Sequence, residues 1–243
     1  VAVDQWNFDN VSQAQTPNWS SALDFVGASN QYLNFGNNIL QDLSNSGTID
    51  SAITFSMWFK LGSSTTSRGM LSIGTFTNSY GKLDVRHQSS AIQIVEYTYS
   101  FTDTSSWHNL VIVYDPTSAS NSLVYIDGVQ AGSNITNVVN LAITSQNLYI
   151  GAYYGNSDTF TGQISNVSAF NTALNAAAIS TLYNNGQPEA AISSSPTSWW
   201  KLDNTTTGIQ DSVGSNNGTN NSTTEIQTKV WTPRLNGEST TLP

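Results

Sequence analysis

The sequence AITFSMWFKL at residues 52–61 decides the fold class, because apolar and polar side chains alternate along it. Successive side chains of a β-strand point to opposite faces of a sheet. One face would carry Ile53, Phe55, Met57 and Phe59, and the other would carry Thr54, Ser56, Trp58 and Lys60. The stretch therefore predicts a strand with one side against a hydrophobic core.

Similar short runs of β-branched and aromatic residues lie on both sides of this strand, separated by Gly, Asn, Asp and Ser. Such spacing is typical of antiparallel strands in a sandwich. The further strands expected are residues 22–26, 32–35, 70–73, 82–87, 92–98, 109–114, 123–126, 148–152 and 163–170. Asp127-Gly128 predicts a tight hairpin turn, because this pair tolerates positive φ. The chain is thus expected to be all-β, with two antiparallel sheets.

One helix and a change of composition mark the C-terminal part of the chain. Residues 176–183, AAAISTLY, follow a capping residue, Asn175, and precede Gly186, which is typical of a short helix. After Pro188 the chain is rich in Ser, Thr, Asn and Gly, apart from two possible strands at 198–203 and 230–235. We expect residues 1–187 to form the sandwich and residues 188–243 to form an extended tail whose strands pair with it or with a partner.

The composition argues against several functions. Only 9% of the 243 residues are charged and the net charge is −9, so the chain lacks the basic surface that nucleic acid requires. The absence of cysteine excludes disulfides and thiolate zinc sites, and the two histidines, His87 and His108, lie far apart. No run approaches the roughly 20 apolar residues of a membrane span. A surface of neutral polar residues suits an extracellular protein better than a cytosolic enzyme.

Four segments, in this order and spacing, resemble a known family. They are Ala22-Leu23-Asp24-Phe25 with Tyr32-Leu33; residues 55–60; Trp107-His108-Asn109-Leu110 through Asp115 with residues 124–128; and Tyr149-Ile150-Gly151 through Gly162-Gln163-Ile164 to residues 173–186. Over about residues 20–187 the chain resembles the laminin-G-like domains of the concanavalin A-like lectin and glucanase superfamily. The resemblance implies a two-sheet antiparallel jelly-roll sandwich with one short C-terminal helix and an extended tail.

The tail also resembles part of that family. Members open with an aromatic-x-Phe-Asp strand and an Asp-Ser-x-Gly-x-x-Asn-Gly-Thr turn. Here residues 200–203, WKLD, are followed by Asp211-Ser212-Val213-Gly214 and Asn217-Gly218-Thr219. The tail is therefore either the start of a second copy or the same opening strand displaced to the other end of the chain.

The resemblance also bears on calcium. Relatives that bind calcium carry acidic residues at positions where this chain has Val26, Gln31 and Ser165. Calcium prefers anionic oxygen ligands, so losing these carboxylates weakens such a site. We expect no cofactor and no tightly bound calcium, although backbone carbonyls and Asn side chains leave weak calcium binding open.

Glycoside hydrolases belong to the same superfamily, so the acidic residues bear on possible catalysis. Retaining enzymes need two carboxylates about 5 Å apart, yet none of the four glutamates lies two or four residues from another acid. Glu96, on the expected strand 92–98, is the best single candidate, but an isolated Glu on a strand is ordinarily solvated. His108 invites a Ser-His-Asp arrangement, but packing and hydrogen bonding explain this position in the family. We expect no enzyme activity.

Two places combine aromatic rings with polar groups, as sugar-binding sites do. The first is a loop with Tyr153, Tyr154, Asn156 and Asp158. The second is the polar face of strand 82–87, with Lys82, Asp84 and Arg86, together with Tyr97 and Tyr99 on its neighbour. The alternative for the loop is that its tyrosines only cover the end of a sheet. The alternative for the strand is that its charged face is only solvated.

The favoured hypothesis is a non-catalytic carbohydrate-binding or adhesion module, placed outside the cell, on a cell surface or on a virion surface. Its partner would be a cell-surface or extracellular glycan, with neither nucleic acid nor a membrane span involved. The alternative is a structural display protein, such as a virion decoration, fibre or appendage subunit. In that case residues 188–243 would bind neighbouring subunits through the apolar stretches 199–202 and 230–235. A glycoside hydrolase-like enzyme ranks third.

Overall fold

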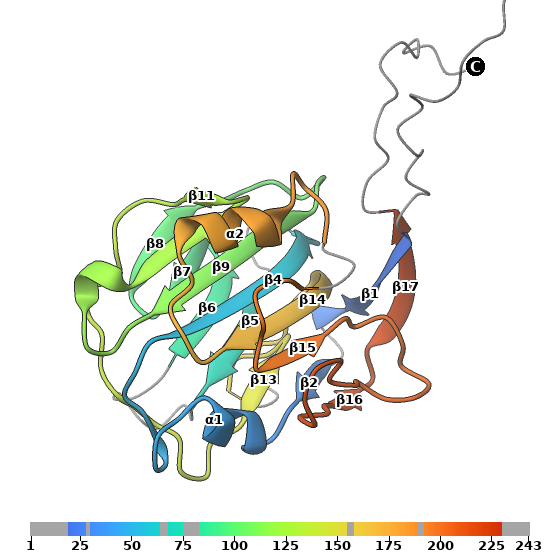
Figure 1. Ribbon diagram of the computed structural model, residues 1–243. Helices are drawn as coiled ribbons and strands as arrows, with labels where there is room; N and C mark the ends of the chain where they lie inside the picture. The colour runs from blue at the N-terminus through green and yellow to red at the C-terminus, as the bar shows by residue number, and fades with distance from the viewer. Residues whose placement is uncertain are drawn as a thin grey trace, which may run out of the picture.

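Two antiparallel β-sheets packed face to face form the molecule in this computed structural model, which describes residues 19–27, 30–63, 68–74, 83–154, 158–188 and 192–229. Figure 1 shows the sheets with one helix lying across the outside of the first. The expected all-β, two-sheet jelly-roll sandwich is confirmed.

The first sheet has eight strands. In spatial order they are β11 (Val129–Gln130), β10 (Leu123–Ile126), β9 (His108–Tyr114), β4 (Ile53–Leu61), β14 (Gly162–Phe170), β1 (Trp19–Phe25) and β17 (Thr224–Lys229), and β15 (Ser198–Trp200) also pairs with β14. At the β17 edge, Trp19 lies opposite Lys229 and Asp24 lies opposite Thr224. The two ends of the described chain therefore lie side by side.

The second sheet has seven strands. In spatial order they are β16 (Thr219–Asn221), β2 (Tyr32–Asn34), β13 (Leu148–Ile150), β5 (Gly69–Ile73), β6 (Leu83–Gln88), β7 (Ala91–Ile94) and β8 (Tyr97–Ser100). A further pair, β3 (Thr48–Ile49) and β12 (Leu141–Ala142), stands apart. Apolar side chains from both sheets, including Phe55, Phe59, Leu71 and Val85, form one continuous core.

Burial of β4 differs from the prediction, which placed only one face against a core. Ser56 and Trp58, on the other face, are also buried. Helix α2 (Ala176–Tyr183) covers this side, and the rings of Trp58 and Tyr183 stack with centroids 6.0 Å apart. The second layer of packing comes from a helix distant in sequence, so alternation along β4 could not reveal it.

Helix α2 has the bounds expected from the sequence. The Asn175 side chain accepts a hydrogen bond from the Ala178 N–H, and Asn184 ends the helix in the left-handed conformation. A second helix, α1 (Asn38–Asp42), was missed because one turn is too short to show periodicity. Among the described residues, neither helix is long or apolar enough to cross a membrane.

The expected strand 92–98 is wrong, because the chain reverses within it. β7 ends at Ile94 and β8 begins at Tyr97, and the intervening Val95 has a φ of 57°. Val95 is a β-branched residue, which ordinarily avoids positive φ. The sequence therefore gave no turn signal at this point.

The C-terminal segment is part of the sandwich, since β15, β16 and β17 pair with β14, β2 and β1. Trp200 is fully buried, with its ring centroid 4.3 Å from that of Phe35, and its indole N–H donates to the Asn216 carbonyl at 2.6 Å. Leu202 and Ile209 join the same core. This arrangement favours the displaced opening strand over a second copy. The stretch 230–235 lies outside the described residues.

Substituting Trp200→Ala should lower the free energy of unfolding by about 3–5 kcal/mol, because it leaves a large cavity in the shared core. Denaturant unfolding followed by circular dichroism measures this change. The control is Val213→Ala in the same segment, whose side chain is 54% exposed and which should cost less than about 0.5 kcal/mol. Equal stabilities for the two variants would contradict the assignment of this segment to the core.

Candidate functional site

The outer face of the second sheet carries charged groups on β6. Val85 points into the core, so its neighbours Asp84 and Arg86 point away from it. The Asp84 carboxylate is buried and lies 3.6 Å from Nε of Arg86, whose side chain is 31% exposed. A buried carboxylate is costly without a partner, so the nearby guanidinium stabilises Asp84 in its charged form.

The loop that follows β13 folds onto this face at a glycine. The Gly69 N–H donates to the Asp158 carbonyl at 2.8 Å. A Cβ added at Gly69 would lie 2.3 Å from the backbone nitrogen of Tyr153, which is closer than real Cβ atoms approach. Gly69 is also paired with Arg86 across the sheet. Because Gly69 has no side chain, the loop can pack closely enough to contact Arg86.

Two tyrosines of this loop cover the charged pair. The Arg86 guanidinium lies 5.0 Å from the ring centroid of Tyr153, and the Tyr153 and Tyr154 centroids are 4.2 Å apart. The Tyr154 hydroxyl donates to Oδ1 of Asp84 at 3.2 Å, and its backbone N–H donates to Oγ of Ser72 at 3.0 Å. We name Asp84, Arg86, Tyr153 and Tyr154 the tyrosine–arginine cluster.

The electrostatics of this cluster keep its parts fixed. Burial, followed by the charge of Asp84, raises the pKa of Tyr154 far above its usual range, so its hydroxyl stays protonated and donates to that carboxylate. The guanidinium gains a cation–π contact with Tyr153. Tyr153 is almost buried, whereas Tyr154 and Arg86 are partly exposed. A ligand on this face would meet the partly exposed Tyr154 side chain and a guanidinium that are already in position.

The structure brings together only part of the two predicted sites. Arg86 joins Tyr153 and Tyr154 in one cluster, and Asp158 lies at its rim, 3.6 Å from Arg68. Arg68 was not predicted as a site residue, because it stands outside every predicted strand. Asn156 and Lys82 lie outside the described residues.

The expectation that Tyr97 and Tyr99 share a face with Arg86 is wrong. Paired residues in a sheet point to the same side, and Val85 pairs with Ile94, which pairs with Tyr97. Tyr97 and Tyr99 therefore face the core, and the Tyr99 hydroxyl donates to the Ser133 carbonyl at 3.0 Å. The unrecognised turn at Val95 changed which face these rings occupy.

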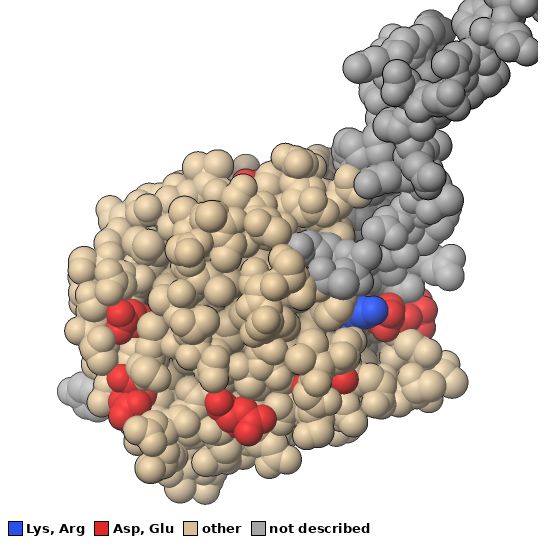
Figure 2. Space-filling model, in the orientation of Figure 1, with Lys and Arg blue, Asp and Glu red and all other residues tan. Residues whose placement is uncertain are grey.

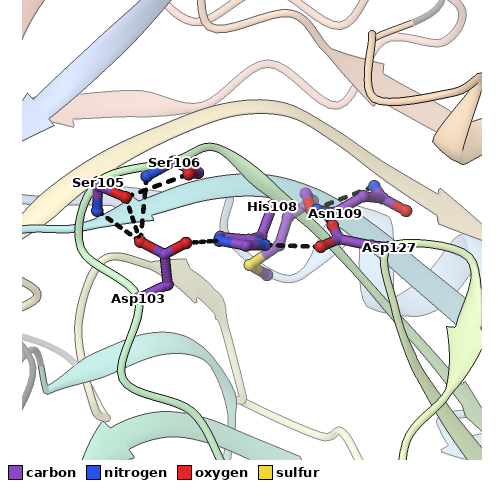
Figure 3. Close-up of polar contacts among 7 residues, drawn as sticks. Asp103, Ser105, Ser106, His108, Asn109 and Asp127 are labelled. Carbon is purple, nitrogen blue, oxygen red and sulfur yellow. Dashed lines mark hydrogen bonds and ion pairs between the residues drawn. The ribbon is translucent and has the colours of Figure 1, made fainter.

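A second cluster surrounds His108, whose two carboxylate partners were not predicted from the sequence (Figure 3). Nδ1 of His108 lies 2.6 Å from Oδ2 of Asp127, and Nε2 lies 3.2 Å from Oδ2 of Asp103. Oδ1 of Asp103 accepts hydrogen bonds from the N–H and hydroxyl of Ser105. The serine hydroxyl therefore contacts a carboxylate and not the imidazole, unlike the relay considered for catalysis.

The two carboxylates favour a charged imidazole. Burial lowers the pKa of His108, but hydrogen bonds to Asp127 and Asp103 and their charges outweigh it, so the net direction is upward. Hydrogen bonds from Ser105 hold the pKa of Asp103 far below its usual range. With both ring nitrogens protonated, His108 donates to both acids and joins the loop before β9 to the β10–β11 turn.

Glu96 does not lie on a strand, contrary to expectation. It stands in the turn between β7 and β8, and its Oε2 accepts a hydrogen bond from Nδ2 of Asn137 at 3.2 Å. The contact is exposed and joins the turn to the loop that contains Asn137. This placement gives Glu96 a neutral amide as its hydrogen-bond partner.

The residues at the calcium positions of the family do not fit a site of that kind. The Gln31 amide accepts from the Val26 N–H and donates to the Ser222 carbonyl at 2.6 Å. The Ser165 hydroxyl donates to the Lys201 carbonyl at 3.3 Å. Both side chains thus bind the C-terminal segment. In the part of the chain that the structure describes, no three His, Asp or Glu side chains are grouped to hold a metal ion.

Comparison with known proteins identifies the fold. The model of the concanavalin A-like lectin/glucanases superfamily matches residues 27–180. Among curated proteins none matches the chain.

Solved structures share the architecture at low identity. A Bacteroides ovatus protein described as a candidate carbohydrate-binding protein is 19% identical, with a TM-score of 0.62 over 86% of this chain and 60% of its own. This chain thus spans about three fifths of that protein. A heptameric SAP-like pentraxin from Limulus polyphemus is 15% identical, with a TM-score of 0.48 over 68% of this chain and 82% of its own. At 19% identity, the likeness to the Bacteroides ovatus protein shows a shared fold.

The His108 cluster predicts a pH-dependent contribution to stability. Because the pKa of His108 is raised in the folded chain, its contribution is fully present below the unfolded pKa of about 6.5 and is lost as pH rises through the folded pKa. His108→Gln should therefore cost about 1–2 kcal/mol near pH 6 and less near pH 9. Urea unfolding at a series of pH values measures the difference.

The control is His87→Gln. Burial lowers the pKa of His87 in the folded chain. The native histidine therefore destabilises the folded chain as the pH falls below the pKa that His87 has in the unfolded chain. The difference between this variant and the parent should vary with pH in the opposite direction. Parallel slopes for the two variants would show that the carboxylates do not charge His108.

Proposed function

Because the chain belongs to the concanavalin A-like lectin/glucanases superfamily, we propose that it is a non-catalytic module that binds glycans at the tyrosine–arginine cluster. The observation that carries the proposal is the convergence of Tyr153, Tyr154, Asp84 and Arg86 on one face of the second sheet. The outer face of the first sheet is covered over β4 by α2.

The chemistry of the cluster suits a sugar. Tyrosine rings pack against the C–H surface of a pyranose, and a guanidinium donates several hydrogen bonds to hydroxyl oxygens. Tyr153 and Asp84 are held in the interior, so they orient Arg86 and Tyr154 and do not need to move when a ligand arrives. A pre-positioned site loses less side-chain entropy on binding.

Binding without catalysis is supported by the surroundings of the acidic and basic groups. Glu96 binds Asn137 in a turn, and both nitrogens of His108 contact carboxylates. A retaining glycosidase needs a second carboxyl group about 5 Å from the first. The tyrosine–arginine cluster contributes one carboxylate, that of Asp84, and a guanidinium neutralises it.

The surface supports a location outside the cell, on a cell surface or on a virion. Figure 2 shows a face on which most of the area is neither acidic nor basic, with acidic groups standing apart. Such a surface avoids strong attraction to charged polymers and leaves selective contacts to neutral groups. An adhesion module that must distinguish glycans fits these properties.

The alternative of a structural display subunit has lost one of its supports. Trp199 and Trp200, with Leu202, were expected to add to a neighbouring subunit, but they are buried in the sandwich of their own chain. Binding of neighbouring subunits through residues 188–243 remains the competing hypothesis. A mass from light scattering, measured beside glycan binding, separates the two.

A glycan array on the intact chain should show selective binding that Tyr154→Ala and Arg86→Met each weaken tenfold or more, because each removes a central contact. The matched control is Tyr97→Ala, which removes a tyrosine from the other side of the same sheet and should leave binding unchanged. Absence of binding by the folded chain, together with a multimeric mass, would instead favour the structural subunit.

A further inference from the structure

A polar hollow lies on the first sheet, away from the tyrosine–arginine cluster on the second. Its volume is about 370 Å³, within the range of about 300–1,000 Å³ that is common for small-molecule sites. The lining consists of Asp24, Phe25, Val26, Lys60, Leu61, Gly62, Thr104, Thr161, Gly162 and Gln163. We name it the strand-end pocket.

Three adjacent strands supply a row of polar side chains to this pocket. Lys60 on β4 pairs with Gln163 on β14, and Gln163 pairs with Asp24 on β1. Their neighbours along the strands, such as Phe59 and Ile164, point into the core, so the row lies on the outer face. Side chains directly opposite in a sheet are about 5 Å apart. The pocket therefore presents an ammonium, an amide and a carboxylate in line.

Close approach of backbone segments fixes one wall. The Gly62 N–H donates to the Thr161 carbonyl at 2.9 Å. A Cβ added at Gly27 would lie 2.2 Å from the hydroxyl oxygen of Thr161, and one added at Gly62 would lie 2.9 Å from its methyl group. Thr161 is thus enclosed by two segments, and each can approach it this closely only because it has a glycine at the point of contact.

The His108 cluster holds the loop that contains Thr104, another residue lining the pocket. Thr104 follows Asp103, whose carboxylate binds the imidazole of His108 and the N–H groups of Ser105 and Ser106 (Figure 3). These contacts hold the loop on both sides of Thr104. The pocket is therefore bounded by elements whose positions do not depend on a ligand.

The charges in the pocket are not neutralised by one another. Within the described part of the chain, none of the ion pairs involves Lys60 or Asp24. Gln163 separates them in the row. A ligand with a carboxylate would find a counter-charge at Lys60, and its hydroxyl groups could donate to Asp24 and bind the amide. Exposed Val26 offers an apolar contact for ring C–H groups.

We propose that the strand-end pocket binds an acidic monosaccharide, with the carboxylate at Lys60 and hydroxyl groups at Gln163 and Asp24. Other ligand classes fit less well. A metal cation would be repelled by Lys60, a phosphate dianion would be repelled by Asp24 more strongly than a carboxylate with a single charge, and a neutral sugar would leave the ammonium unmatched. The site lies on a different sheet from the tyrosine–arginine cluster, so it stands or falls separately from the proposed function.

Titration of the full chain with glucuronate, followed by isothermal calorimetry or by NMR of the Gln163 side-chain amide, tests the proposal. Binding should saturate, and glucose should bind at least tenfold more weakly because it lacks the charge. Lys60→Gln should weaken glucuronate binding about tenfold or more. Gln163→Glu, which places a negative charge beside the ligand, should do the same without removing a lysine.

A control separates this pocket from another cationic place. Lys201→Gln removes an ammonium that lies 4.7 Å from the ring centroid of Trp199. This variant should bind glucuronate as the parent does. The proposal is overturned if the folded parent shows no saturable binding, if glucose binds equally well, or if Lys60→Gln leaves the affinity unchanged.

Discussion

The pairing of β14 with three other strands is the constraint on which the rest of the sandwich depends. One side of β14 runs along β4, and the other side pairs first with β1 and then with β15, which lie end to end. The register shifts between Ser165 and Ser168, where Asn166 adopts a φ of 46° and donates its N–H to the Lys201 carbonyl at 3.1 Å. This bulge is where one partner strand gives way to the other, so segments from both ends of the chain complete a single sheet.

Much of this fold could be predicted from local pattern. Alternation identified β4, β9 and β14, and the capping Asn175 with Gly186 after the last turn indicated α2, because these signals lie within a few residues of one another. Packing between distant segments gave no such signal. The burial of Trp58 under α2 and the place of Trp200 in the core depend on contacts across more than a hundred residues of chain.

The candidate site shows the same division. Tyr153 and Arg86 were each identifiable as residue types suited to sugar binding, but their contact depends on Gly69, where the loop approaches β5. Tyr97 and Tyr99 were grouped wrongly because a single turn at Val95 decides which face they occupy. The hydrogen bonds from Asp103 through His108 to Asp127 join a loop, the start of β9 and the β10–β11 turn. No spacing in the sequence predicts these contacts.

The register of β1 and β17 has a mechanical consequence. Trp19 and Lys229 lie opposite each other at one end of an antiparallel pair, so a force that pulls the chain apart at these two residues acts across their hydrogen bonds, and not along the strands. The bonds would then break one after another, as in a zipper. Tension on this sandwich would peel β17 away from the edge of the sheet before it loaded the core.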